Sequence, residues 1–217
     1  MVFAGDGADL FLISAKTDRG LTLFLVPATA ERVSVWPIKL YDRAGAADLQ
    51  LDGCFVPSSA RLGMEGEAQA SVAWAMDRTS AAFANEAVGL MAALCDMTVD
   101  YLKTREQFGQ AIGKFQVLQH RAVDMRINLE LATSMAMLAT VAVSDTNERR
   151  RSRDVSAARA AIGKASRIVC QSAIQLHGAI ALTDEYPAGD YVKRLTLIER
   201  SIGDVRWHLE RFAGLSA

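Results

Sequence analysis

The sequence predicts an α+β protein that is mainly helical, in which a partial antiparallel β-domain (residues 1–66) precedes an antiparallel four-helix bundle (residues 67–217). Two observations lead to this fold class. Up to about residue 57 the apolar residues form short runs separated by glycine and proline, a pattern typical of strands and turns. After residue 66 the apolar residues recur at helical spacing over long segments, which is typical of amphipathic helices.

The β-region contains four predicted strands, at residues 10–14, 21–26, 33–38 and 49–51. Turn residues separate them, namely Gly20, Pro27, Gly45 and Gly53. So few strands leave backbone edges and an apolar face open, because a small sheet needs further strands or a helix to cover it. We therefore expect the β-domain to be incomplete, or to be completed by a partner.

Three long helices are predicted at residues 68–102, 115–143 and 153–177, followed by a shorter helix at 190–212 with a break near Gly203. Each long helix carries one apolar stripe, with small residues that allow antiparallel helices to pack closely. The polar, arginine-rich residues 147–153 are expected to form a solvated connector. The predicted stripes are Val88, Ala92, Cys95, Val99 and Leu102; Leu118, Ala122, Met125, Leu129, Ala132, Ala136, Ala139 and Val143; and Val155, Ala158, Ile162, Ala165, Val169, Ser172 and Leu176.

Composition narrows the classes of function. The chain has 24 Lys and Arg against 25 Asp and Glu and no basic block, which argues against nucleic acid as a partner. No apolar run reaches the roughly 18–20 residues that span a bilayer, and residues 1–20 lack the pattern of a secretory signal, so we expect a cytoplasmic protein without a membrane span. The three cysteines are expected to be buried thiols, and no metal-ligand spacing is present.

Two motifs between the predicted helices point to a function. Arg105-Glu-Gln-Phe-Gly109 is followed seven residues later by Gln116, and Gln175-Leu-His-Gly178 ends the third predicted helix. Together with Leu51-Asp-Gly-Cys-Phe-Val-Pro57 and Thr183-Asp-Glu-Tyr-Pro187, they resemble the acyl-CoA dehydrogenase family. The resemblance covers nearly the whole chain and runs from the second half of the family's middle β-domain through its C-terminal helical domain.

The resemblance implies a set of FAD contacts across a dimer interface. Arg105, Gln107, Phe108 and Gln116 would contact FAD, with the guanidinium pairing with the diphosphate. Gln175 and Gly178 of the neighbouring subunit would approach the diphosphate and adenosine side, where a glycine lets the backbone come close. In place of the family's frequent Gly-Gly-x-Gly, this chain has Gly-Ala-Ile-Ala at residues 178–181. Asp77 resembles a residue near the CoA moiety, but Ser80 stands where an arginine often follows.

The resemblance also implies a reaction. In the family a desolvated glutamate removes the α-proton of an acyl-CoA thioester while the β-hydrogen leaves as hydride to the flavin, giving a trans-2-enoyl-CoA. The two positions at which the family places this glutamate correspond to Ile202 and Thr79, neither of which can take the proton. Glu86, within an apolar stretch, is the predicted base, and Glu199 is the second candidate. The alternative reading of Glu86 is a carboxylate paired with a cation or lying at the bundle surface.

The motif wording is most similar to the bacterial branch that includes steroid side-chain and dicarboxyl-CoA dehydrogenases. The first functional hypothesis is an acyl-CoA dehydrogenase chain in a homo- or hetero-dimer or tetramer, passing electrons to an electron-transferring flavoprotein. A second is a non-catalytic subunit of a heteromer that forms the oligomer interface and one wall of a flavin site. A third is a flavin oxidase or monooxygenase on the same fold.

Overall fold

The computed structural model describes residues 1–216, which form two compact units that divide between Ala73 and Trp74. The sequence predicted a boundary at residue 66, and the division lies seven residues later, within the first turns of helix α1 (Gln69–Thr104). The expected order, strands before helices, is the order in the structure.

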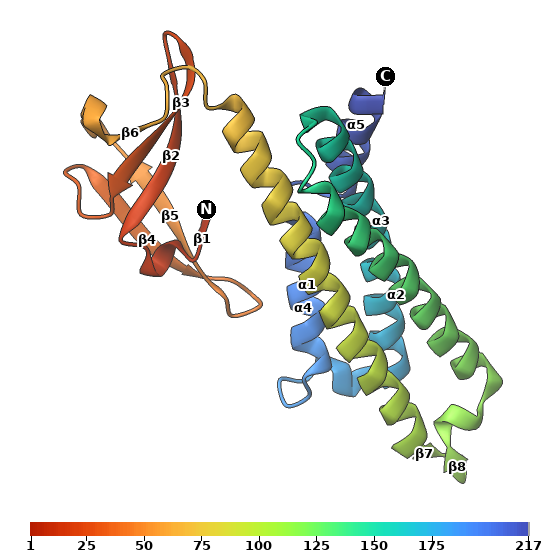
Figure 1. Ribbon diagram of the computed structural model, residues 1–217. Helices are drawn as coiled ribbons and strands as arrows, with labels where there is room; N and C mark the ends of the chain where they lie inside the picture. Colours follow the sequence, from red (N-terminus) through yellow and green to blue (C-terminus); the bar gives the residue numbers. More distant parts are fainter. Residues whose placement is uncertain (217) are drawn as a thin grey trace. The chain divides into compact units, whose positions relative to one another are not determined.

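The first unit consists of two small antiparallel sheets (Figure 1). One has the order β1 (Val2–Phe3), β5 (Gly45–Leu51) and β4 (Val33–Lys39), and the other has the order β2 (Leu10–Thr17), β3 (Gly20–Pro27) and β6 (Arg61–Leu62). The four predicted strands all lie within β2, β3, β4 and β5. The register sets Phe11 opposite Val26 and Val35 opposite Leu49.

The β-unit has a small apolar core. Its buried apolar side chains are Phe11, Leu23, Val26, Ala46, Ala47 and Ala68, whereas Leu10 and Leu12 on the other side of β2 are exposed. Because side chains alternate across a strand, β2 has one buried face and one exposed apolar face. These open faces match the expectation of a sheet with too few strands to cover itself.

The second unit is the helical bundle formed by α1, α2 (Gln116–Ala142), α3 (Glu148–His177), α4 (Ala188–Arg200) and α5 (Val205–Ser216). Figure 1 shows α2 and α3 side by side along their lengths. Met91, Met125, Ile162 and Leu195 are among the largest fully buried side chains. The predicted fold class is confirmed, and so is the break near Gly203, which separates α4 from α5.

The apolar stripes of α2 and α3 were predicted well, but that of α1 was displaced around the helix. Ala84, Met91 and Leu94 are buried in the core, whereas Val88 is only partly buried and Val99 is exposed. Between residues 81 and 95 this helix is apolar on nearly every side. Periodicity alone therefore could not select the face that turns inward.

By length and composition alone, α1 could cross a membrane, contrary to the expectation from the sequence that no segment is apolar enough. This is weak support for a membrane span, because a core helix of a soluble bundle passes the same test. Much of the apolar character of α1 belongs to residues that pack in the bundle core.

The cysteines differ in their surroundings. Cys95 of α1 and Cys170 of α3 are buried, as predicted, and Cys54 is half-buried. Burial raises the pKa of both Cys95 and Cys170 to about 11, so these thiols stay protonated and unreactive near neutral pH.

The prediction of a solvated connector at residues 147–153 was wrong, because most of these residues form the first two turns of α3. Asn147 caps this helix, and its side chain accepts a hydrogen bond of 3.0 Å from the Arg150 N–H. Arg151 and Ser152 are buried. A charged run at a helix start therefore points partly into the protein.

The partner of these two residues is Asp77, which is fully buried on α1. One carboxylate oxygen accepts hydrogen bonds from Arg151 Nε at 3.0 Å and Ser152 Oγ at 2.7 Å, and the other accepts from Arg211 Nη1 at 2.7 Å. Because Arg211 belongs to α5, one carboxylate joins α1, α3 and α5. We call Asp77, Arg151, Ser152 and Arg211 the Asp77 cluster.

We predict that Asp77→Ala lowers the free energy of unfolding by about 3–5 kcal/mol, because it leaves a buried guanidinium without its counter-charge. The measurement is urea unfolding followed by circular dichroism. Asp100→Ala is the matched control on the same helix, since the Asp100 side chain is exposed and lies 3.5 Å from Lys103. A similar change in the two variants would contradict the structural role of the Asp77 cluster.

Candidate functional site

The first predicted cofactor motif forms a hairpin between α1 and α2. Its strands are β7 (Glu106–Gln107) and β8 (Gln110–Ala111), and its two-residue turn is Phe108-Gly109. Both turn residues have positive φ, 55° and 76°, as a tight two-residue turn requires. Phe108 is a bulky residue in this conformation, and it is 91% exposed. A strained backbone that presents an aromatic ring to solvent is typical of a ligand-binding position.

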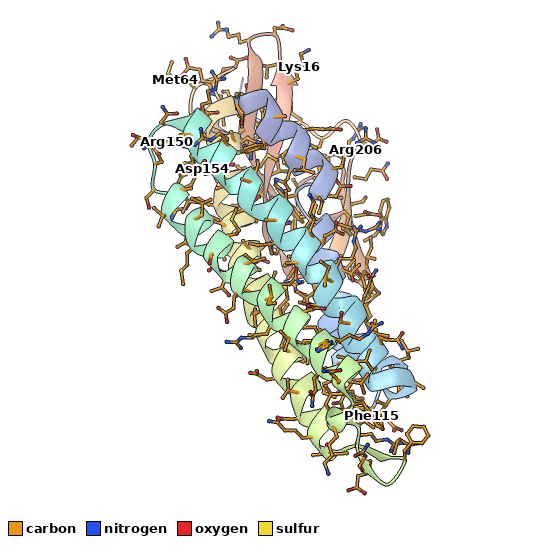
Figure 2. All side chains as sticks on the ribbon, turned by 90° about the vertical axis from the view of Figure 1, so that its right-hand side faces the viewer. Lys16, Met64, Phe115, Arg150, Asp154 and Arg206 are labelled. Atoms are coloured by element: carbon orange, nitrogen blue, oxygen red, sulfur yellow. The ribbon has the colours of Figure 1, made fainter. Side chains whose placement is uncertain are left out.

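The other residues of this motif lie in the hairpin or directly beside it. Arg105, Gln107 and Gln116 are exposed, and among residues 1–216 the Arg105 side chain has no hydrogen bond or ion pair. Phe115, labelled in Figure 2, packs edge-on against Phe108 with ring centroids 6.0 Å apart. We call Arg105, Gln107, Phe108 and Gln116 the hairpin corner. Its unpaired guanidinium and exposed ring fit a phosphate-containing aromatic ligand.

The second predicted motif lies where α3 ends. Gln175 is exposed, and Gly178 ends the helix with φ 71° and ψ −146°, a conformation that side chains rarely adopt. Space above Gly178 is open, since nothing lies within 4 Å of a Cβ placed there. A ligand could therefore approach this backbone closely. We call Gln175 and Gly178 the α3 corner.

The alanines that replace glycines of the family pattern at residues 178–181 hinder the approach of a cofactor less than the sequence suggests. Of the two alanines that replace glycine, Ala181 is buried in the bundle core, and only Ala179 is exposed. One added methyl group therefore points inward. With the unpaired Arg105 and the open backbone at Gly178, the residues present fit an FAD diphosphate.

Three aromatic side chains join the ends of α1 and α3. The His177 ring lies against Tyr101 of α1, with centroids 4.7 Å apart, and its Nε2 is 3.0 Å from the Tyr186 hydroxyl. Nδ1 lies 2.9 Å from the Ala173 carbonyl, which can only accept, so Nδ1 carries the proton and Nε2 accepts from Tyr186. The hairpin corner and the α3 corner therefore belong to the same end of the bundle. No pattern in the sequence predicted this role for His177.

A groove of about 450 Å³ lies between α3 and α4 beside the α3 corner. Ile174 and Val192 line it and also line a smaller pocket that continues to Ala181 in the loop after Gly178. Glu199, the second candidate for the base, lies at its other end, where the carboxylate accepts a 3.2 Å hydrogen bond from Arg167. Glu199 is thus a paired carboxylate on the groove wall.

Glu86, the predicted base, forms a two-point ion pair. Its carboxylate oxygens lie 2.6 Å from Nε and 3.0 Å from Nη2 of Arg194 on α4. Such paired geometry stabilises the charged form and holds the carboxylate in place. Glu86 is therefore paired with a cation, as in the alternative interpretation of the sequence. Its catalytic role stays a prediction.

The expected contact of Asp77 with CoA is corrected by the structure. The Asp77 carboxylate is buried within the bundle, and both oxygens are used by the Asp77 cluster. A ligand cannot reach it there. Position 80 is a serine, and the arginine of α5 that binds the Asp77 carboxylate is Arg211. Ser80 Oγ is buried and has no hydrogen-bond partner among residues 1–216.

Ile202, at the family's main position for the base, lies in the turn between α4 and α5. It has φ 56°, a costly conformation for a β-branched residue, and Gly203 follows with φ 93°. The buried Arg159 donates to the Ile198 and Ser201 carbonyls at 2.7 and 2.9 Å. The turn is therefore fixed from inside the bundle. Thr79, at the other family position, is exposed and donates to the Ala75 carbonyl at 2.9 Å.

The comparison with protein families agrees with this geometry. The family model for the acyl-CoA dehydrogenase C-terminal domain matches residues 66–205. The chain belongs to the acyl-CoA dehydrogenase family. This match covers α1 to α4 and both corners.

Relatives of this acyl-CoA dehydrogenase chain are longer. The mitochondrial 2-methylacyl-CoA dehydrogenase of Solanum tuberosum is 28% identical over 210 residues, which cover 92% of this chain and 50% of that protein. Among solved structures, the Tcur3481–Tcur3483 steroid acyl-CoA dehydrogenase variant has a TM-score of 0.87 at 28% identity over 99% of this chain and 56% of that one. The ChsE4–ChsE5 complex of Mycobacterium tuberculosis has a TM-score of 0.86 at 26% identity over 97% and 56%. The chain thus spans about half the length of its relatives.

Beside the turn, this acyl-CoA dehydrogenase chain buries a histidine whose titration can be tested. Burial, followed by the charges of Arg159 and Arg211, lowers the pKa of His208 from 6.5 to about 4. Neither ring nitrogen has a hydrogen-bond partner among the described residues. The unfolded chain therefore binds a proton near pH 6.5 that the folded chain refuses until about pH 4.

We predict that the stability due to neutral His208 is fully present above pH 6.5 and is lost as the pH falls toward 4. The loss should be about 3 kcal/mol, at about 1.4 kcal/mol for each tenfold change in proton affinity. Urea unfolding between pH 7.5 and 4.5 measures it, and His208→Leu should flatten the dependence relative to wild type. The control His120→Gln replaces an exposed histidine and should keep the wild-type slope. Equal slopes for all three proteins would contradict the prediction.

Proposed function

We propose that this chain takes part in FAD-dependent α,β-dehydrogenation of an acyl-CoA thioester to the trans-2-enoyl-CoA, with electrons passed on to an electron-transferring flavoprotein. One observation carries the proposal: the hairpin corner holds an unpaired Arg105 and an exposed, strained Phe108 at the bundle end that also carries the α3 corner. The conserved fold of its relatives supports it.

Each corner has its own task in this proposal. Arg105 binds diphosphate oxygens, and Phe108 covers the adjoining part of the cofactor. Gly178 and Gln175 of a neighbouring protomer bind the diphosphate and adenosine side through backbone and amide groups. When bound, FAD supplies the hydride acceptor. The chain's own contribution is to hold the cofactor and exclude water from it.

A second candidate function rests on the carboxylates. Ile202 and Thr79 cannot act as bases, and Glu86 and Glu199 are both paired with arginines. This supports the alternative of a non-catalytic subunit, in which an unlike chain supplies the base and this chain supplies an oligomer interface and one wall of the flavin site. The ChsE4–ChsE5 complex, a relative that contains two different chains, is consistent with this alternative.

We predict that the purified chain carries flavin absorbance and that Arg105→Ala weakens FAD binding by about 10- to 100-fold, the loss expected for charge-assisted hydrogen bonds to phosphate. Phe108→Ala should also weaken binding while changing the free energy of unfolding by no more than about 0.5 kcal/mol, since the ring is solvent-exposed. Titration of each apoprotein with FAD measures the two affinities, and urea unfolding measures the free energy of unfolding. Arg206→Ala, which removes an exposed arginine of α5, is the control. Equal affinity in all variants would refute the assignment of the hairpin corner.

The role of Glu86 can be separated from its ion pair. If Glu86 is the base, Glu86→Gln abolishes anaerobic bleaching of the flavin by saturated acyl-CoA thioesters without loss of flavin. Arg194→Gln breaks the same pair but keeps the carboxylate, so bleaching should persist in that variant. Bleaching that survives in both variants would remove Glu86 as the base and leave Glu199 as the remaining candidate. A wild-type chain that binds flavin but is not bleached would support the heteromeric alternative.

A further inference from the structure

The groove between α3 and α4 has an apolar wall and ends where the two helices meet. Its volume is about 450 Å³, and Ile174, Val192 and the buried Leu195 form the wall. The helices come into contact at Gly163, where a Cβ would lie 3.4 Å from Glu199 Cγ, so the groove ends there. A space of this size with an apolar wall is typical of a site for a small ligand. We call it the α3–α4 groove.

The end of the groove at Glu199 carries more positive than negative charge. The Glu199 side chain is 11% exposed, and its carboxylate accepts a 3.2 Å hydrogen bond from Arg167 and lies 3.9 Å from Arg200. Arg159 lies beneath this end of α4, where it donates to the Ile198 carbonyl. Burial lowers the pKa of Arg159 to about 10, and the charge of Glu199 acts against this shift. Three guanidinium groups therefore share one carboxylate. We call Arg167, Glu199 and Arg200 the charged end.

The two exposed arginines of the charged end can bind a second anion. The side chains of Arg167 and Arg200 are 61% and 76% exposed. Arg167 gives Glu199 one hydrogen bond, and the 3.9 Å separation of Arg200 from Glu199 is longer than a hydrogen bond. Since a guanidinium has several N–H donors in a planar fork, most of these donors remain for a ligand. Such a fork matches the oxygens of a carboxylate or a phosphate.

The opposite end of the groove has no such excess of positive charge. There the groove continues into a pocket of about 160 Å³ with which it shares part of its apolar wall. Lys193, the charged residue of that pocket, lies 3.6 Å from Asp184 and 3.4 Å from Asp190. From Gly189 to Glu199, α4 is about 15 Å long. The groove therefore offers an apolar path of roughly this length, with an excess of positive charge at one end.

We propose that the α3–α4 groove binds an amphipathic anion, with a carboxylate or phosphate headgroup at the charged end and an aliphatic chain along the apolar wall. The arginines supply the counter-charge, and burial of the chain removes apolar surface from water. A neutral apolar ligand would leave the exposed guanidinium groups unused, and a cationic ligand would be repelled by them. The site does not depend on a bound flavin, since no residue of the hairpin corner or the α3 corner lines the groove.

Isothermal titration calorimetry of the purified chain tests this proposal with decanoate and decyl phosphate, each below its critical micelle concentration. We expect a single site, and the tighter of the two ligands identifies the headgroup. Decanol has the same chain without the charge and should bind about 10-fold more weakly or worse. The double variant Arg167→Gln/Arg200→Gln should raise the dissociation constant of both anions by about 10-fold or more. Arg206→Gln, which changes an exposed arginine of α5 outside the groove, is the matched control and should bind as wild type does.

A further variant tests the apolar wall. Thr196→Trp places a large ring in the groove from an exposed position of α4 and should abolish binding of both anions, and circular dichroism checks that each variant is folded. Wild-type affinity in the folded double variant or in folded Thr196→Trp would overturn the proposal. The same conclusion would follow if decanol bound as tightly as the anions, if neither anion bound, or if Arg206→Gln lost as much affinity as the double variant.

Discussion

The helical unit depends on one buried carboxylate. Asp77 has no contact with water, and its two oxygens are shared by guanidinium and hydroxyl groups from α3 and α5. Removing a carboxylate from water costs several kcal/mol, and the attraction offsets this only when the remaining lone pairs are also bonded. The Asp77 cluster meets that condition. It therefore fixes α1, the helix that carries the hairpin corner, against the two helices that follow later in the chain.

At the other end of α1 the constraint is aromatic rather than ionic. Tyr101, His177 and Tyr186 hold the ends of α1 and α3 together, so the two corners are presented by a rigid end of the bundle. Burial lowers the pKa of His177, which keeps it neutral and able to accept the Tyr186 hydroxyl. The strain at Phe108 persists because the helices on both sides of the hairpin are fixed. Preorganisation of this kind reduces the entropy lost when a ligand binds.

Periodicity and turn residues predicted the order and type of every long element, because α2 and α3 have one clear apolar side and β2 to β5 are separated by glycine or proline. The wrong predictions concern segments in which the order of apolar and polar residues does not show which side faces the core. In α1 apolar residues occur on nearly all sides, so only the packing of Asp77 and Leu94 selects the inward face. Residues 147–153 are polar, yet Arg151 has a buried counter-charge 74 residues earlier in the chain, at a distance no local pattern reveals. Likewise, motif spacing identified the corners, but the pairing of Glu86 with Arg194 required the fold.

The backbone of the turn at Ile202 is fixed by contacts that do not involve the Ile202 side chain. Arg159 binds two carbonyls of this turn, and a Cβ on Gly203 would collide with the Trp207 ring. Asp204 accepts a 2.8 Å hydrogen bond from the Trp207 N–H and starts α5. All of these contacts fix the backbone, and none requires a particular side chain at position 202. The strained turn is therefore held by its surroundings and not by the isoleucine that it contains. Under the proposed function, the proton acceptor would be Glu86 after it leaves Arg194, Glu199, or a group of another chain.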